Sequence, residues 1–283
     1  MTELNYRLLN VFTRDQAVLS GNPLCVFESG AGLDTPTMQA LARQFNLSET
    51  TFILPASTSS ADAQVRIFTP NYELPFAGHP TLGTADVCRS LKLGSDEVRL
   101  QMKAGIIPVV ANAARWTLTA NAPTTRELSV ARERLAQLLG VQTGEIAERP
   151  LWVKSGKEQL VVPLTSADAV RRASPGPAMF HEVQSEDGES MAYVFAEIGG
   201  GQVLARFFFP QGTSVLEDPA TGSATVNLGG WWLAMQRPLP CSLVASQGEQ
   251  IARPSTLYLN IDPPRQIRVG GDVIELGRGR LRL

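Results

Sequence analysis

Two glycine-containing segments, one in each half of the chain, have the composition of a turn that opens into a helix. They are Gly78-His79-Pro80-Thr81 and Gly222-Ser223-Ala224-Thr225. The first turn of a helix leaves backbone N–H groups unpaired and carries partial positive charge, so it binds anions. Glycine at such a point lets a ligand come close to the backbone. The two segments indicate a site for a carboxylate-bearing substrate, with two ordinary glycine-started helices as the plainer interpretation.

Glu49 is the titratable residue whose surroundings are most typical of proton transfer. It lies in Asn46-Leu47-Ser48-Glu49-Thr50-Thr51-Phe52-Ile53, between the end of an expected helix and an apolar strand. A carboxylate on such a connection is partly desolvated, which raises its pKa toward the range useful for general acid–base work. We therefore take Glu49 as the candidate acid and base. A solvated loop glutamate or a helix cap is the alternative.

Three further polar residues accompany the glycine segments or stand apart from them. Asp218 precedes the second segment, where it could accept hydrogen bonds from backbone donors or a substrate amine, or simply cap the helix. His79 directly follows the first glycine, and a histidine hydrogen-bonded within the fold is the competing interpretation. His181 lies in a Pro/Gly-rich neighbourhood and is expected at the surface.

Composition excludes several classes of function. Apolar residues make up 43% and charged residues 18%, which is typical of a globular protein, and the net charge of −2 provides no basic stripe for nucleic acid. No apolar run approaches the roughly 18–20 residues that cross a membrane, and the N-terminus lacks the pattern of a signal peptide. With two histidines and no ligand spacing, no metal is expected. Cys25, Cys88 and Cys241 are interpreted as small buried hydrophobes of a cytoplasmic protein.

The chain repeats its own pattern, which shows how the candidate residues would be positioned. Arg66-Ile67-Phe68-Thr69-Pro70 returns 140 residues later as Arg206-Phe207-Phe208-Phe209-Pro210, and each reads as a strand stopped by proline ahead of a glycine segment. Upstream, Ser20–Val26 resembles Ser155–Val161. The common order favours an ancient duplication, with two unrelated α/β domains as the alternative.

The coarse organisation is two lobes, residues 1–122 and 123–283, with the tail from about residue 270 as a candidate to pack on the first lobe. A helix is expected from Thr35 to Asn46, capped by Asp34 or Thr35, and another from Ser129 to Leu139. Asn121–Glu127 is interpreted as a linker. The remaining expected strands are 51–54, 63–68, 97–102, 106–110 and 116–120. Long helices are too few for a doubly wound nucleotide-binding sheet.

At this point the sequence resembles the PhzF-like (phenazine biosynthesis) family, whose fold is shared with diaminopimelate epimerase. The matching stretches run in family order across nearly the whole chain: Gly21–Val26, Asn46–Thr50, Phe68–Pro70 with Glu73–Thr81, Glu217–Ala224, and Gln247-Gly248 with Arg253–Ser255. The resemblance implies an α/β (α+β) fold of two similar lobes, each a curled mixed sheet or barrel around a central helix, with the active cleft between them. It also implies a homodimer without a cofactor.

Residue by residue, the resemblance makes Glu49 the general acid and base. It makes Gly78, His79, Asp218, Gly222 and Ser223 the lining of the substrate site. The epimerase and racemase relatives place a cysteine before each helix-start glycine, whereas this chain has Ala77 and Thr221 there. Neither side chain exchanges protons near pH 7, so a two-cysteine mechanism is not expected.

We therefore expect an isomerase that shifts a proton on a small carboxylated cyclic or unsaturated metabolite. Glu49 would remove the proton and return it elsewhere, while the two helix starts hold the carboxylate. Two alternatives remain open from the sequence: a cofactor-independent epimerase that uses Glu49 with another group, and a catalytically idle protein that binds small acids. No nucleic acid or membrane partner is expected.

Overall fold

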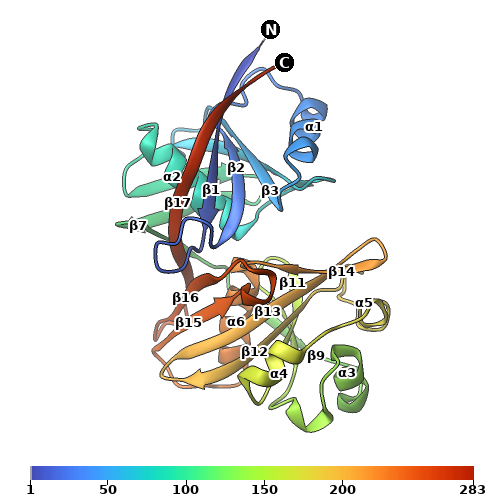
Figure 1. The fold of residues 1–283 in the computed structure, drawn as a ribbon. Coiled ribbons are helices and arrows are strands. Elements are labelled where there is room, and N and C mark those ends of the chain that lie inside the picture. Colours follow the sequence, from blue (N-terminus) through green and yellow to red (C-terminus); the bar gives the residue numbers. More distant parts are fainter. Residues whose placement is uncertain (1) are drawn as a thin grey trace. The chain divides into compact units, whose positions relative to one another are not determined.

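The chain folds into two compact units (Figure 1), and the computed structural model describes residues 2–283. Unit 1 contains residues 2–119 together with Gly270–Leu283, and unit 2 is Ala120–Val269. The chain therefore passes between the units twice, near residue 120 and near residue 270. Within residues 2–283, no helix is both long enough and apolar enough to span a membrane.

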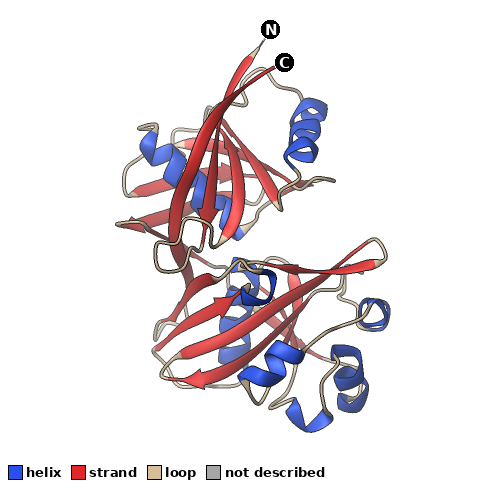
Figure 2. Ribbon diagram, viewed as in Figure 1, coloured by secondary structure: helices blue, strands red, loops and turns tan. Residues whose placement is uncertain are grey.

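Unit 1 is a closed barrel of eight strands with one short extra strand (Figure 2). Its strands pair in the order β1-β2-β3-β4-β6-β7-β8-β17, and β17 returns to β1. The β2/β3 and β4/β6 pairs are parallel, so each needs a crossover, which α1 and α2 provide. The elements are β1 Glu3–Val11, β2 Asn22–Phe27, α1 Thr35–Phe45, β3 Glu49–Leu54, β4 Ala63–Phe68, β5 Glu73–Leu74, α2 Gly78–Ser90, β6 Glu97–Met102, β7 Gly105–Asn112, β8 Arg115–Thr119 and β17 Ile267–Arg282.

Unit 2 repeats this pairing order around its own helix. β10/β11 is antiparallel, β11/β12 parallel, β12/β13 and β13/β14 antiparallel, β13/β15 parallel and β15/β16 antiparallel. These pairs match β1/β2, β2/β3, β3/β4, β4/β5, β4/β6 and β6/β7. The elements are β9 Thr124–Glu127, α3 Arg132–Leu139, β10 Leu151–Lys154, β11 Glu158–Pro163, α4 Ala167–Arg172, α5 Pro177–Glu182, β12 Ala192–Gly199, β13 Gln202–Gln211, β14 Ser214–Asp218, α6 Gly222–Ala234, β15 Cys241–Gln247 and β16 Ser255–Ile261.

The helix at the centre of each unit is buried on all sides. Ten of the thirteen residues of α2 are buried, and the helix contacts β1–β4 and β6–β8. In α6, eleven of thirteen residues are buried. A helix with no solvated face belongs in a core, which is why both segments lack the polar stripe of a surface helix. The predicted fold class, two lobes of like topology with a curled mixed sheet around a central helix, is confirmed.

The repeated pentapeptides carry an arginine that fastens each strand to the segment after it. Arg66 forms a salt bridge with Glu73 of β5 at 2.7 Å and lies over the ring of Phe68. Arg206 forms the same bridge with Glu217 of β14 at 2.7 Å and lies over Phe208. The aromatic face and the carboxylate hold the guanidinium from two sides.

Two local expectations differ from the structure and one agrees closely. The segment expected as the linker 121–127 contains β9, which pairs with β10 and so belongs to the sheet of unit 2. The helix expected from Ser129 begins at Arg132, with Ala131 as its N-cap. α1 is as expected at its start: the Asp34 carboxylate accepts a hydrogen bond from the Thr37 N–H, and Asn46 ends the helix in the left-handed region.

The packing around α6 yields a first prediction, for Gly230. A Cβ there would lie 2.6 Å from Cγ1 of Val153 and 2.8 Å from Cβ of Pro123. Gly230→Ala should therefore lower the free energy of unfolding by about 1–3 kcal/mol, although alanine favours helix by about 1 kcal/mol. Urea unfolding measures the change. Gly144→Ala, which meets nothing within 4 Å, is the control and should stay within about 0.5 kcal/mol. Equal stability of the two variants would contradict the packing argument.

Candidate active site

The structure brings Glu49 and His79 together in unit 1. Glu49 is the first residue of β3, where it pairs in parallel register with Leu24 of β2. His79 is the second residue of α2 and is 6% exposed. The Glu49 Oε2 and His79 Nε2 atoms lie 3.4 Å apart, and the Glu49 side chain is 16% exposed. The strand start and the helix start therefore present a carboxyl group and an imidazole to each other.

His79 is neutral at physiological pH. Burial lowers the pKa of its imidazole to about 3, and a hydrogen bond to the backbone of Pro23 acts in the opposite direction. Proline has no N–H, so its backbone accepts and the imidazole donates. Nε2 makes no hydrogen bond within residues 2–283, so the donor is Nδ1. Nε2 therefore carries a lone pair and faces the carboxyl group of Glu49.

This arrangement suits a group that takes up and releases one proton. When Glu49 is ionised, two acceptors face each other at 3.4 Å. When Glu49 carries a proton, its O–H can donate to Nε2 of His79. In that state the imidazole would accept a hydrogen bond without adding a charge of its own.

In unit 2, the segment before α6 is held by a network centred on Gln247. Its Nε2 donates to the carbonyl of Asp218 at 2.9 Å and to Oγ1 of Thr221 at 3.0 Å, while its Oε1 accepts from the Thr221 N–H at 3.2 Å. The Thr221 hydroxyl donates to Oδ2 of Asp218 at 2.5 Å. The N-cap residue of α6 is Thr221, whose own side chain makes no capping hydrogen bond. Asp218 ends β14 and accepts the hydrogen bond from Thr221.

Gln247 itself was not among the predicted site residues. It appeared only within a matching stretch, together with Gly248. Gly248 has φ +79, and a Cβ there would lie 2.3 Å from the Arg253 carbonyl and 2.5 Å from the Pro219 carbonyl. Only glycine fits between these two segments.

Neither α2 nor α6 has a side-chain cap at its N-terminus. The first N–H groups of α2 belong to Gly78 and His79, and those of α6 to Gly222 and Ser223. Such groups need an acceptor. Ser223 is partly exposed, and its Oγ accepts a hydrogen bond from Gln159 Nε2 at 3.0 Å. The predicted site residues therefore form two groups: Glu49, Gly78 and His79 in unit 1, and Asp218, Gly222 and Ser223 in unit 2.

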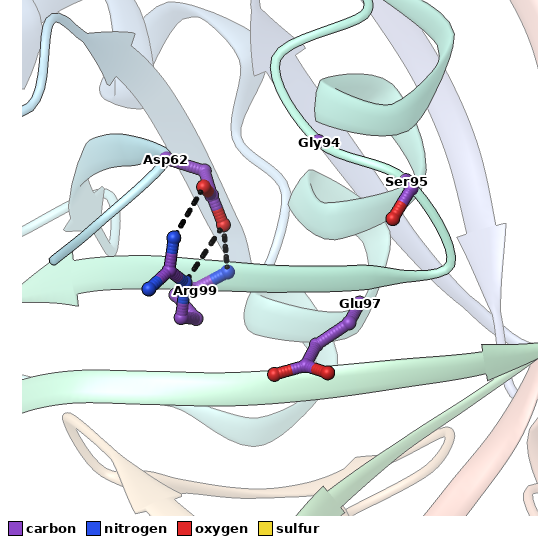
Figure 3. A pocket seen from close by; sticks show the side chains of 5 residues that line it. All are labelled: Asp62, Gly94, Ser95, Glu97 and Arg99. Carbon is purple, nitrogen blue, oxygen red and sulfur yellow. Dashed lines mark hydrogen bonds and ion pairs between the residues drawn. The ribbon is translucent and has the colours of Figure 1, made fainter.

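Across residues 2–283, no three His, Cys, Asp or Glu side chains gather in a way that could hold a metal ion. A surface groove of about 350 Å³ in unit 1 is lined by Asp62, Gly94, Ser95, Glu97 and Arg99 (Figure 3). Hydrogen bonds from Arg99 lower the pKa of Asp62, so the charge of this carboxylate is already paired. His181 is exposed, as the sequence predicted.

Comparison with known proteins gives consistent matches along the whole chain. A family model described as "Phenazine biosynthesis-like protein" (PhzC-PhzF) matches residues 9–276. An uncharacterized isomerase of Pasteurella multocida is 38% identical over 285 residues, which cover 99% of this chain and 95% of the relative. Trans-2,3-dihydro-3-hydroxyanthranilate isomerase of Pseudomonas aeruginosa is 31% identical over 290 residues, 98% of this chain and 99% of the relative. The crystal structure of a Bacillus anthracis PhzF-family protein shares the fold, with a TM-score of 0.86 and 24% identity over 100% of both chains.

The buried neutral imidazole predicts how stability depends on pH. The folded-state pKa of His79, about 3, lies below the ordinary value of 6.5, so the unfolded chain binds a proton that the folded chain refuses. The stabilising contribution is complete above about pH 6.5 and is lost as the pH falls toward 3. His79→Asn should therefore lose less stability than the wild type between pH 7 and pH 4.5, measured by urea unfolding.

The control for this measurement is His181→Asn, which removes the exposed histidine. That variant should keep the wild-type loss of stability on acidification. A loss in His79→Asn as large as that of the wild type would show that the folded protein protonates His79 readily.

Proposed function

The chain belongs to the PhzC-PhzF family of phenazine biosynthesis-like proteins, and from this premise we propose that it shifts a proton on a small carboxylated cyclic or unsaturated metabolite without a cofactor. Its membership of the isomerases follows from the family and from its relatives. The particular reaction, the substrate class and the roles of the residues are the proposal. A homodimer is part of it, testable by light scattering.

The contact between Glu49 and His79 carries this proposal. In the first step the ionised Glu49 takes a proton from a substrate carbon: the C–H bond breaks, an O–H bond forms, and the electron pair moves into the conjugated system of the substrate. The new O–H donates to Nε2 of His79, which stabilises the intermediate state. In the second step the same proton goes to another carbon, so Glu49 is ionised again and the substrate is isomerised.

The remaining groups would bind and orient the substrate. Each helix start offers uncapped N–H groups suited to a carboxylate, through Gly78 and His79 in α2 and through Gly222 and Ser223 in α6. Asp218, fixed by Thr221, would accept a hydrogen bond from an amine or hydroxyl substituent. Trans-2,3-dihydro-3-hydroxyanthranilate, the compound in the name of the 31% identical relative, carries a carboxylate, an amine and a hydroxyl on an unsaturated ring and is the first substrate to test.

Replacing Glu49 by glutamine tests the proton-transfer role. Glu49→Gln should lower kcat on trans-2,3-dihydro-3-hydroxyanthranilate by about 10²–10⁴, because the amide cannot accept the substrate proton. Absorbance follows the conversion, and mass spectrometry in D₂O shows whether the transferred proton is retained or exchanged with solvent. Glu97→Gln, at an exposed site on β6, is the matched control and should keep wild-type activity. Wild-type turnover by Glu49→Gln would remove Glu49 from the reaction.

The cysteines yield a separate prediction that distinguishes this mechanism from a two-cysteine epimerase. Ala77 and Thr221 occupy the helix-start positions where such enzymes have cysteines. All three cysteines are buried, and burial raises the pKa of Cys88 to about 12 and that of Cys241 to about 11. Thiolates are the reactive form, so N-ethylmaleimide at pH 7.5 should leave the activity of the folded enzyme unchanged.

The protein unfolded in urea is the control for this reagent, because all three thiols should then react. Inactivation of the folded enzyme by N-ethylmaleimide, prevented by substrate, would indicate a catalytic thiol.

A further inference from the structure

A chain of hydrogen bonds runs through the interior of unit 2 and ends at the start of α6. Nδ2 of Asn227 donates to the Lys157 carbonyl at 3.1 Å and to Oε1 of Gln159 at 2.8 Å. Nε2 of Gln159 then donates to Oγ of Ser223 at 3.0 Å. Asn227 and Gln159 are 1% and 2% exposed, so water does not compete for these bonds.

The donor-to-acceptor direction of these hydrogen bonds is set where the Lys157 carbonyl binds Asn227. The Lys157 carbonyl can only accept, so the amide group of Asn227 must turn its NH₂ toward it. The same NH₂ has a second hydrogen, which needs an acceptor, and Oε1 of Gln159 is the acceptor in reach. With Oε1 used in this way, Gln159 must turn its NH₂ toward Ser223. Each amide orientation therefore follows from the one before it.

We propose that Gln159 and Asn227 are positioning residues that make the Ser223 hydroxyl a hydrogen-bond donor toward the ligand. Because Oγ of Ser223 accepts from Gln159, its own hydrogen points elsewhere, and no acceptor for it appears among residues 2–283. This donor lies beside the uncapped N–H groups of the first turn of α6. Ser223 thus adds a side-chain donor to the backbone donors of the first turn, and this combination suits an acceptor such as a carboxylate oxygen.

One polar atom of Asn227 makes no hydrogen bond. Its Oδ1 is buried and has no hydrogen-bond partner within residues 2–283. Such an atom destabilises the fold, and an apolar side chain of similar size would avoid the loss. Packing alone would therefore favour an apolar residue at this position. The asparagine is explained if its NH₂ group is needed to orient Gln159.

The equivalent position in unit 1 offers an acceptor where Ser223 offers a donor. His79, like Ser223, is the second residue of its helix. Each is hydrogen-bonded to the second residue of the matching strand, Pro23 in β2 and Gln159 in β11. Pro23 accepts through its carbonyl, so the other ring nitrogen of His79, Nε2, is an acceptor that faces Glu49. Gln159 donates, so Ser223 is left with an outward donor.

A double-mutant cycle tests the positioning role, and this arm rests on the proposed function. With trans-2,3-dihydro-3-hydroxyanthranilate, Ser223→Ala should raise KM about tenfold, the loss of one hydrogen bond to a charged group. Gln159→Met should raise KM roughly three- to tenfold with kcat nearly unchanged, and in the Ser223→Ala background it should add less than about twofold. Asn227→Leu should reproduce the effect of Gln159→Met. Gln137→Met, an exposed glutamine of α3, is the control and should leave KM unchanged.

A second arm needs no substrate. The side-chain NH₂ signals of Gln159 are those that Gln159→Met removes from the ¹⁵N NMR spectrum of the folded protein. Ser223→Ala should move one of these signals upfield, because its hydrogen loses an acceptor. Additive effects on KM, or Gln159 signals that Ser223→Ala leaves in place, would overturn the proposal. If the wild type is inactive but the NMR signal shifts as expected, the proposed substrate is rejected. The hydrogen bonds from Asn227 through Gln159 to Ser223 are then still supported.

Discussion

A helix buried along its length inside a curved sheet is the constraint on which the rest of each unit depends. α2 and α6 have no face turned to solvent, and their side chains fill the space that the strands enclose. A buried helix still begins with N–H groups that its own turns cannot satisfy, and neither helix supplies a side-chain cap. The fold therefore creates a strong donor site at the start of each central helix. Closing a sheet around a helix thus leaves backbone donors at the helix start, and the proposed carboxylate binding would use them.

The repeated arginine bridges fix the segments that lead to these helix starts. Glu217, bound by Arg206, is followed directly by Asp218, and Glu73, bound by Arg66, lies five residues before Gly78. The side chains at both bridges are largely buried, so removing one partner would leave a charge with little water around it. Both units therefore share the parts that hold the helix starts. The residues next to the helix-start glycines differ: a histidine in unit 1 and a serine in unit 2.

The elements that the sequence predicts well are those with local signals. Asp34 caps α1, and the glycine segments open two helices, because capping and turn chemistry involve neighbouring residues. β9 was missed because its sequence, Thr124–Glu127, is polar, and its membership of a sheet depends on pairing with distant β10. The sequence did not indicate a role for Gln159 or Gln247 either. Each is a single amide within a strand, and its role appears only when the chain brings it against the start of α6.

The burial that makes α2 a core helix also sets the chemistry of Glu49. A solvated histidine beside a carboxylate gains a proton and forms an ion pair, which stabilises the ionised carboxylate and weakens it as a base. Inside unit 1, burial keeps His79 neutral, and the Pro23 carbonyl holds its hydrogen on Nδ1. The imidazole then offers Nε2 as an acceptor, which only a protonated Glu49 could use as a hydrogen-bond donor. In the proposed reaction, the carboxyl group would gain a hydrogen bond to His79 when it accepts the substrate proton and would lose that bond when it releases the proton.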